Sequence, residues 1–435
     1  MPLDISRAGG IARAQIKTVN RHDAGGVYFL AMSSASTALH PRDRFGLSAY
    51  YFATFAGVGF STPFLPLYWK SLGFTYLQIG SLVALASAAG AAMLVPAGAW
   101  SDRVRRRHPF IMSGSLLVSA CFLLYPLVRS YAAFAVMQTL VGVGSTMSLA
   151  IAAALGADLF ASSREGRSFA EVRAWGTIGF IMTMGAAAAI PGLVQGRQYF
   201  IITGLLYLGA GLSVLLVGRP AIRGGRSELS FEGVGVILRN ANTRAFVVAY
   251  LLGYMALMPA TANLSLYLKS FYPPASPRII PLAYAISAGC ELPFLFIMGW
   301  AADRFGRMLP LRICYIVLPV RLALYAAATV PTTALALQAT HGLTFSVLAV
   351  VPFAFMADAA PPRYRATGQA LLNAAGSAAY ALGPLAAGRV ADLVGIRNLY
   401  LFLAAIALTG SVILFGLVRE PSRAVLANEA ALENA

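Results

Sequence analysis

The stretch that decides the fold is GAWSDRVRRR at residues 98–107, where a long apolar segment runs into a basic loop. Its pattern, Gly-x-x-x-Asp-Arg, occurs a second time as GWAADR at residues 299–304. The two copies begin 201 residues apart (299 − 98), which is close to half of the 435-residue chain. A repeat on that scale in so apolar a sequence predicts two similar helical bundles joined end to end.

The composition around the repeat is that of a membrane protein. Of all residues, 58% are hydrophobic and only 11% are charged, whereas a soluble domain carries about a quarter charged residues. The mean hydropathy is +0.71. Apolar residues come in long blocks such as residues 81–100, and a block of about 20 is long enough to cross a bilayer as a helix. The sequence therefore predicts an all-α polytopic membrane protein.

Twelve transmembrane helices fit the chain as two six-helix bundles, at residues 45–217 and 244–418. The polar stretch 218–243 separates them and is expected to be a cytoplasmic linker. Residues 1–44 are basic without the apolar core of a signal peptide, so we expect a cytoplasmic tail there and a second, short one at residues 419–435. The first, seventh, eleventh and twelfth spans are expected at about residues 45–69, 244–268, 365–391 and 396–418.

The net charge of +17 is distributed unevenly over the loops between these spans. Most Lys and Arg residues fall in loops that share a side with the N-terminus. Those expected on the other side are Lys70, Arg129, Arg197, Lys269, Arg278 and Arg397. Because positive loops stay inside, we expect both termini in the cytoplasm and a cell membrane, in a bacterium the inner one, as the location. The partner of this charge is then the lipid bilayer and not nucleic acid.

Signals for metal or enzyme chemistry are missing from the sequence. The three cysteines (Cys121, Cys290 and Cys314) lie in predicted spans and have no metal-like spacing. No phosphate-cradling glycine loop and no Ser-His-Asp arrangement stands out. We expect no metal, no cofactor and no enzymatic activity, in a protein that works as a monomer.

An aspartate and an arginine beside a glycine at a helix end can latch two helices together. Glycine lets a neighbouring helix approach, and the carboxylate can cap that helix or pair with an arginine. The predicted cytoplasmic gate residues of this kind are Gly98, Asp102 and Arg103 in the first half and Gly299, Asp303 and Arg304 in the second. Asp158 and Asp358 end the fourth and tenth predicted spans and are interpreted as gate latches as well.

The paired signature, each copy after the second span of a half, resembles the cytoplasmic loop signature of the major facilitator superfamily. The resemblance covers about residues 45–418 and implies the major facilitator fold, a central cavity and alternating access. Other segments are similar to the branch that holds phenylpropionate permeases, nucleoside–proton symporters and, more distantly, lactose permease. These segments are Arg173-Ala-Trp175-Gly176, Gln338-x-x-His341-Gly342 and Gln369-Ala-Leu-x-Asn373.

Three ionisable side chains fall near the middle of consecutive spans in the second half, namely Glu291, Arg321 and His341. A charge inside a span is costly unless it faces a cavity or a partner. A carboxylate at Glu291 stays ionised beside Arg321 and takes up a proton when that partner is lost. We therefore predict that the three residues couple transport to protons, with His341 as relay or substrate donor. The alternatives are a static Glu291–Arg321 ion pair and a His341 that only packs.

The resemblance to lactose permease supports this set but not in every detail. That permease has a similar Glu, Arg and His on the same helices, and a glutamate one turn after the histidine that accepts the coupled proton. Here that position is Thr344, which cannot take up a proton. The predicted proton carrier is therefore Glu291.

Substrate contacts are expected from both halves. Arg173 lies three residues before Gly176, where the same resemblance implies a substrate-binding arginine, and Trp175 would stack on a ring. The alternative for Arg173 is snorkelling to the membrane surface. Further predicted cavity residues are Tyr254, Asn263, Gln338 and Asn373; for the aromatic one, simple packing is an equal alternative.

These observations predict a secondary active transporter whose partners are protons and a small molecule. The leading interpretation is proton-coupled uptake of a small organic solute such as an aromatic carboxylate, by alternating access. Alternatives are a nucleoside or sugar symporter, an antiporter that exports drugs or metabolites, and a membrane sensor that has lost transport. Exporters of the superfamily carry a Gly-Pro signature in the fifth span, which matches poorly here.

Overall fold

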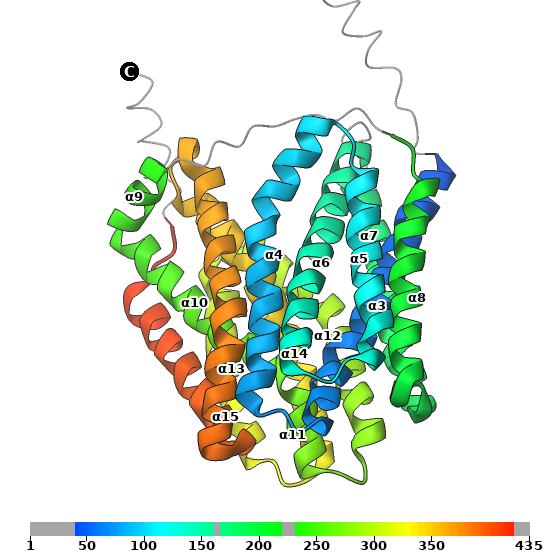
Figure 1. Cartoon of the computed structure of the whole chain (residues 1–435). Coiled ribbons are helices and arrows are strands. Elements are labelled where there is room, and N and C mark those ends of the chain that lie inside the picture. Colours follow the sequence, from blue (N-terminus) through cyan, green and yellow to red (C-terminus); the bar gives the residue numbers. More distant parts are fainter. Residues whose placement is uncertain (1–39, 161–165, 220–230, 422–435) are drawn as a thin grey trace, which may run out of the picture.

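A computed structural model describes residues 40–160, 166–219 and 231–421, and within these ranges the regular structure is helical (Figure 1). The predicted tails and the middle of the predicted linker, residues 1–39, 220–230 and 422–435, lie outside the described residues. The first half contains α3 (Pro41–Ser71), α4 (Tyr76–Val104), α5 (His108–Leu124), α6 (Tyr131–Phe160), α7 (Gly166–Ala189) and α8 (Gly196–Ser213). Short 3-10 turns follow at η1 (Tyr125–Leu127), η2 (Pro191–Val194) and η3 (Val214–Leu216).

The second half repeats this order with two differences. Its elements are α9 (Phe231–Arg239), α10 (Ala241–Ala262), α11 (Leu264–Phe271), α12 (Ser276–Phe305), α13 (Met308–Ala327), α14 (Pro331–Ala359), η4 (Pro362–Tyr364) and α15 (Arg365–Leu417). The expected seventh span is divided into α10 and α11 at Asn263, one turn after Pro259, which cannot donate a helical hydrogen bond. The expected eleventh and twelfth spans share the label α15 and are two helices that meet at a kink at Gly395, whose backbone (φ 83°) is not helical.

Nine helices of the described part of the chain are long and apolar enough to cross a membrane. α15 is one of them and is long enough for two spans. α3 and α7 have the length but fall below the apolarity of the nine. With α10 and α11 as one span, the helices account for the twelve predicted crossings.

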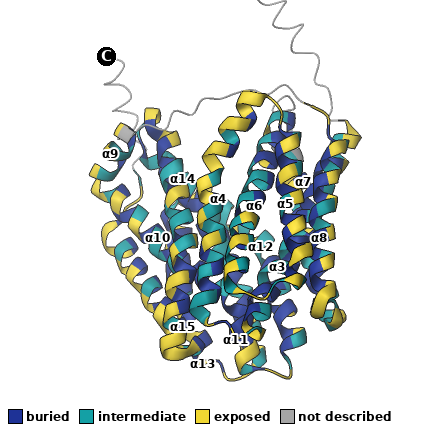
Figure 2. Cartoon of the chain, viewed as in Figure 1, coloured by how far each residue is buried: buried dark blue, intermediate teal, exposed yellow. Residues whose placement is uncertain are grey.

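Packing between the helices separates two groups. In the first half α3 packs on α7 and α8, and α6 packs on α4 and α5; in the second, α15 packs on α10 and α13, and α14 packs on α12. The groups meet mainly where α4 contacts α15 and where α7 contacts α12. Figure 2 shows exposed residues on the outward sides of the helices and buried ones where helices face one another. The limits drawn at residues 45–217 and 244–418 stay predictions.

The α4–α15 contact depends on glycine. A Cβ at Gly80 would collide with the carbonyl oxygen of Pro384, and one at Gly388 with the carbonyl oxygen of Tyr76. Two helix backbones approach this closely only where side chains are absent, as small-residue interfaces in membranes allow. The contact lies toward the N-terminal end of α4, which is the end of the molecule opposite to Asp102 and the arginines that follow it.

Candidate functional site

A cavity of about 690 Å³ lies between the halves, bordered by α3, α4, α6, α7 and α15. Its lining on α4 and α6 includes Leu94 and Ala153, which lie between the helix middles and the ends that carry Asp102 and Asp158. We call that end of the molecule the basic-loop end. The second half contributes Ser377 and Tyr380 to the cavity.

Arg173 of α7 is the charged side chain among the lining residues of this cavity. Its guanidinium carbon lies 5.2 Å from the ring centroid of Phe55 and 5.7 Å from that of Tyr51, within cation–π range. No acidic group of the described residues pairs with it within 4 Å, so its donors remain available to a ligand.

Trp175 does not lie beside Arg173. Residues two apart on a helix point about 200° apart, and Trp175 is 47% exposed and absent from the cavity lining. The aromatic surfaces next to the guanidinium are instead those of Tyr51 and Phe55 on α3. The rings beside the guanidinium therefore come from a neighbouring helix, which sequence spacing cannot indicate.

Glu291 of α12 is half-buried, and no ion pair of the described residues involves it. The basic group whose charge acts on it is Arg173, and its own charge acts on Tyr380 of the cavity lining. The backbone carbonyl of Glu291 accepts a hydrogen bond from Ser346 Oγ at 2.9 Å. The Glu291 carboxyl is therefore within electrostatic reach of Arg173, although Glu291 is not among the residues that line the cavity.

Arg321 of α13 is buried and donates to one face of α14. Its guanidinium donates to His341 Nδ1 at 3.1 Å, to Thr344 Oγ1 at 3.1 Å and to Gln338 Oε1 at 3.2 Å. Ser287 Oγ of α12 donates to the same Gln338 oxygen at 2.6 Å. We call these five residues the Arg321 cluster.

The expected ion pair between Glu291 and Arg321 is wrong for this structure. Both residues are described, no ion pair joins them, and Arg321 takes its hydrogen-bond partners from α14. Since a guanidinium only donates, the bond to His341 makes Nδ1 the acceptor and places the ring proton on Nε2. Thr344, which sequence reasoning treated as a lost carboxylate, is a partner of Arg321. The sequence signal that could have indicated this contact is the position of Thr344, three residues after His341.

Two donors of the Arg321 cluster have no partner among the described residues, namely Arg321 Nε and Gln338 Nε2. Buried polar groups are nearly always hydrogen-bonded, so such groups call for an explanation. Both atoms are fully buried, and none of the cavities described here includes Arg321 or Gln338 in its lining.

The other predicted cavity residues have different roles. Tyr254 is buried, packs 4.7 Å from the ring of Tyr250 and reaches the carbonyl of Leu348 at 3.5 Å. Asn263 Nδ2 donates to the carbonyl of Pro259 at 2.9 Å and stabilises the break between α10 and α11. Asn373 is exposed and lies one turn before the cavity residue Ser377 on the same face of α15.

At the basic-loop end, each half closes around one arginine. In the first half Arg107 contacts Asp102 at 3.0 Å and Asp158 at 2.5 Å. Arg107 thereby joins the ends of α4 and α6 to the start of α5. The predicted gate aspartates are thus engaged, but by the arginine that opens the next helix and not by Arg103, which is exposed.

The second half has the same arrangement around Arg307. Its guanidinium contacts Asp303 at 2.5 Å and Asp358 at 2.9 Å, while Arg304 is exposed. Burial opposes the charged form of Arg307, but the hydrogen bonds that it donates to Asp303 and Asp358 outweigh this, so its pKa lies above its usual value. Both arginine clusters tie helices within a half, and neither bridges the two halves.

A contact between the halves is found at the opposite end. Asp392 of α15 accepts hydrogen bonds from the backbone amides of Tyr76 at 2.9 Å and Leu77 at 2.8 Å, the first two residues of α4. The negative charge also lies at the positive end of the α4 dipole. Together with Gly80 and Gly388, this carboxylate holds the halves together at the end opposite to the basic loops.

A family model described as the MFS_1 like family matches residues 45–402. Maltose permease of Geobacillus stearothermophilus is 22% identical over 373 residues, which span 85% of this chain and 93% of that protein. Raffinose permease of Escherichia coli is 25% identical over 410 residues, spanning 88% and 94%. The crystal structure of the nucleoside transporter NupG superposes with a TM-score of 0.76 at 16% identity, covering 86% of this chain and 98% of that one. At this identity the structural likeness concerns the fold alone.

Proposed function

Since this chain belongs to the MFS_1 like family, we propose that it is a proton-coupled symporter that takes up a small organic solute, with an aromatic carboxylate as the leading class. The major facilitator fold and the membrane transporter class, as opposed to an enzyme, are shown by the family match and the permease relatives. Proton coupling, direction and substrate are the proposal.

One observation carries it: Arg173, which lines the cavity, and Glu291 belong to opposite halves and lie within electrostatic reach of each other, and neither has an ion pair within 4 Å among the described residues. A carboxylate that binds Arg173 neutralises the charge that stabilises the ionised Glu291. The Glu291 carboxylate then takes up a proton more readily, because it is left in apolar surroundings. Anion and proton therefore enter the cycle together, which is symport.

The surroundings of Arg173 favour an aromatic acid within the class of carboxylates. The rings of Tyr51 and Phe55 flank the guanidinium and offer apolar faces to a ring attached to the carboxylate. A cavity of about 690 Å³ is within the range of small-molecule sites. We place the basic-loop end in the cytoplasm of a bacterial inner membrane, with both termini on that side and the protein acting as a monomer.

Transport into proteoliposomes under an imposed inward proton gradient tests the proposal. An aryl-propionate is expected to accumulate, and collapse of the gradient with an uncoupler is expected to stop accumulation. Glu291→Gln should abolish accumulation but keep counterflow exchange, because a permanently neutral residue 291 mimics the protonated form. The matched control is Glu171→Gln on α7, an exposed acid paired with Arg44 at 3.4 Å, which should accumulate normally. Normal accumulation by Glu291→Gln would exclude this residue as the proton carrier.

A nucleoside or sugar symporter is the second candidate. The unpartnered Arg321 Nε and Gln338 Nε2 suit solute hydroxyl groups, and two of the relatives are named for sugars. Including a nucleoside and a disaccharide in the same uptake panel decides between the classes. Counterflow of either one that is lost in Gln338→Leu, with no uptake of the aryl acid, would favour the second candidate. Outward transport of a solute against an inward proton gradient would instead indicate the antiport alternative.

A further inference from the structure

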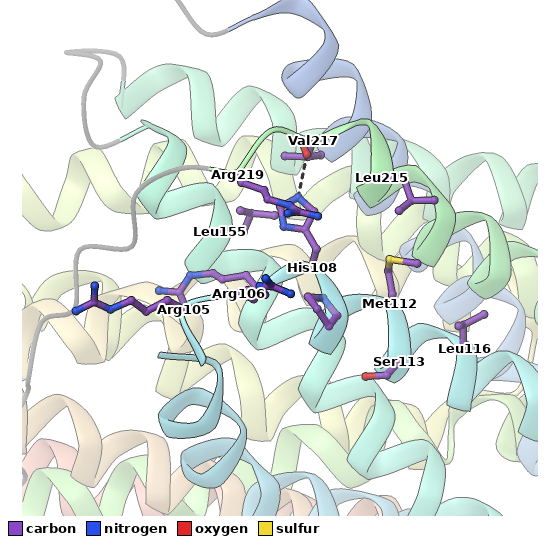
Figure 3. A pocket seen from close by; sticks show the side chains of 12 residues that line it. Arg105, Arg106, His108, Met112, Ser113, Leu116, Leu155, Leu215, Val217 and Arg219 are labelled. Carbon is purple, nitrogen blue, oxygen red and sulfur yellow. Dashed lines mark hydrogen bonds between the residues drawn. The ribbon is translucent and has the colours of Figure 1, made fainter. Parts of the chain in front are cut away.

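A second cavity, of about 420 Å³, lies at the basic-loop end of the first half, away from the interface between the halves. Figure 3 shows Arg105, Arg106 and Arg219 on one side of it and the apolar Met112, Leu116 and Leu215 on the other. His108 lies between them and bonds the carbonyl oxygen of Val217 at 2.9 Å. Neither the transport cycle nor the arginine clusters account for this cavity.

The arginines at its edge differ from Arg107. Whereas Arg107 is neutralised by Asp102 and Asp158, no ion pair of the described residues involves Arg105, Arg106 or Arg219. The first turn of α5 also opens onto the cavity, and its N-cap side chain makes no capping hydrogen bond. The cavity therefore combines unpaired cations with the positive end of a 17-residue helix, a combination that attracts an anion.

The second half shows what occupies the equivalent position. Glu420 accepts hydrogen bonds from the amides of Arg307 and Met308, both at 2.7 Å, and so caps the start of α13. Its sequence context, VREP at residues 418–421, matches VGRP at residues 217–220, which puts Arg219 at the position of Glu420. The second half thus supplies its own anion, and the first half replaces that anion with a cation.

The apolar side of the cavity indicates the source of the missing anion. Leu116 is 40% exposed and Leu215 is 56% exposed, on α5 and η3, so both face outward from the bundle. A soluble anion gains nothing from contact with such an apolar surface, whereas an acyl chain that extends from the bilayer can pack against it. Basic pockets of this kind between helices suit anionic lipid headgroups.

We propose that this cavity binds the phosphodiester headgroup of an anionic phospholipid. Arg105, Arg106 and Arg219 contact the phosphate, which lies at the start of α5 as the Glu420 carboxylate does at α13. The acyl chains pack along Met112, Leu116 and Leu215. The bound lipid anchors the first half to the leaflet at the basic-loop end, and the second half needs none.

Lipid binding by the full chain tests this directly. Purified protein is mixed with phosphatidylglycerol or phosphatidylcholine, and bound lipid is counted by native mass spectrometry while the unfolding midpoint is followed by intrinsic fluorescence. The native protein should retain one phosphatidylglycerol molecule and unfold at a higher temperature with it than with phosphatidylcholine. Arg219→Glu should weaken that binding at least tenfold and remain folded, because the new carboxylate copies the Glu420 cap.

Controls separate this site from general surface charge and from soluble anions. Arg106→Gln should weaken binding in the same direction, whereas Arg103→Gln, a neighbouring exposed arginine outside the cavity lining, should bind as the native protein does. Equal binding by Arg219→Glu, Arg106→Gln and the native protein overturns the site. An equal loss of lipid binding in Arg103→Gln would mean that general surface charge, and not this cavity, binds the lipid. Glycerol phosphate that raises the midpoint as much as the lipid overturns the lipid assignment in favour of a soluble phosphate.

Discussion

Arg321 shows how a buried charge can be held without a counter-charge. Three neutral acceptors of α14 surround its guanidinium, and the deciding one is His341, which must be unprotonated at Nδ1 to accept. The geometry therefore assigns His341 an acceptor role toward Arg321. That role differs from the proton relay that its position suggested.

Two substitutions separate these roles. In His341→Asn the amide oxygen can accept from Arg321 but cannot relay a proton, so folding and symport should persist if the acceptor role dominates. His341→Leu leaves the buried guanidinium without that acceptor and should lower stability by about 1–3 kcal/mol. Thermal unfolding and gradient-driven uptake of both variants provide the readout. A stable His341→Asn protein that exchanges solute but cannot accumulate it would restore the relay.

Arg173 supports a prediction about shape as well as charge. A lysine keeps the charge but lacks the planar group that lies against Tyr51 and Phe55 and that binds a carboxylate through two parallel bonds. Arg173→Lys should raise the KM for the solute about tenfold with folding intact, and Arg173→Gln should raise it further. The control is Arg129→Lys, which lies outside the cavity lining. An unchanged KM in Arg173→Lys would remove this residue from the substrate site.

At the level of helices, the contact between α15 and α4 controls closure at the end opposite to the basic loops. Asp392→Asn keeps the size of the side chain but removes its charge and one of the two acceptor oxygens, and the loss of one such hydrogen bond costs about 1 kcal/mol. The population with this end open should increase accordingly. Spin labels at residues 70 and 269, one in each half, should show a larger share of long distances. Asn398→Ala, whose side chain bonds only its own helix, should not change the distribution.

For the whole molecule, we predict that the two arginine clusters contribute unequally to the stability of the protein. The Asp158 side chain is 9% exposed and its counterpart Asp358 is 29% exposed. Arg107→Gln therefore strands a more deeply buried carboxylate than Arg307→Gln, and a broken buried pair costs about 3–5 kcal/mol. Thermal unfolding should show the larger loss for Arg107→Gln. Equal losses would mean that the difference in burial has no energetic effect.

The pattern of the sequence predicted the repeat, the helical class and the family, because these depend on periodic apolar blocks and a signature present twice. It also predicted that Asp102 and Asp303 engage arginines, but not which ones. Asp102 pairs with Arg107 because the chain reverses between α4 and α5, and that reversal is a matter of tertiary structure.

The same limit explains the sites in the interior. Spacing along one helix predicts that Gln338 and His341 share a face, and both contact Arg321, but the third partner, Thr344, was not predicted. Whether Glu291 faces Arg321 or Arg173 depends on the rotation of α12 against two different helices. No periodicity within a single segment contains that information.

The two amides that Asp392 caps have a consequence for measurement. The third residue of α4, Gln78, receives its cap from Thr75 of its own half, at 3.1 Å, so that bond does not depend on contact between the halves. The amides of Tyr76 and Leu77 lose their acceptor each time the halves separate at this end. Deuterium should then enter residues 76 and 77 at a rate set by the opening frequency, while residue 78 provides an internal reference. The exchange rates of three consecutive backbone amides thus report how often the halves separate, without any attached label.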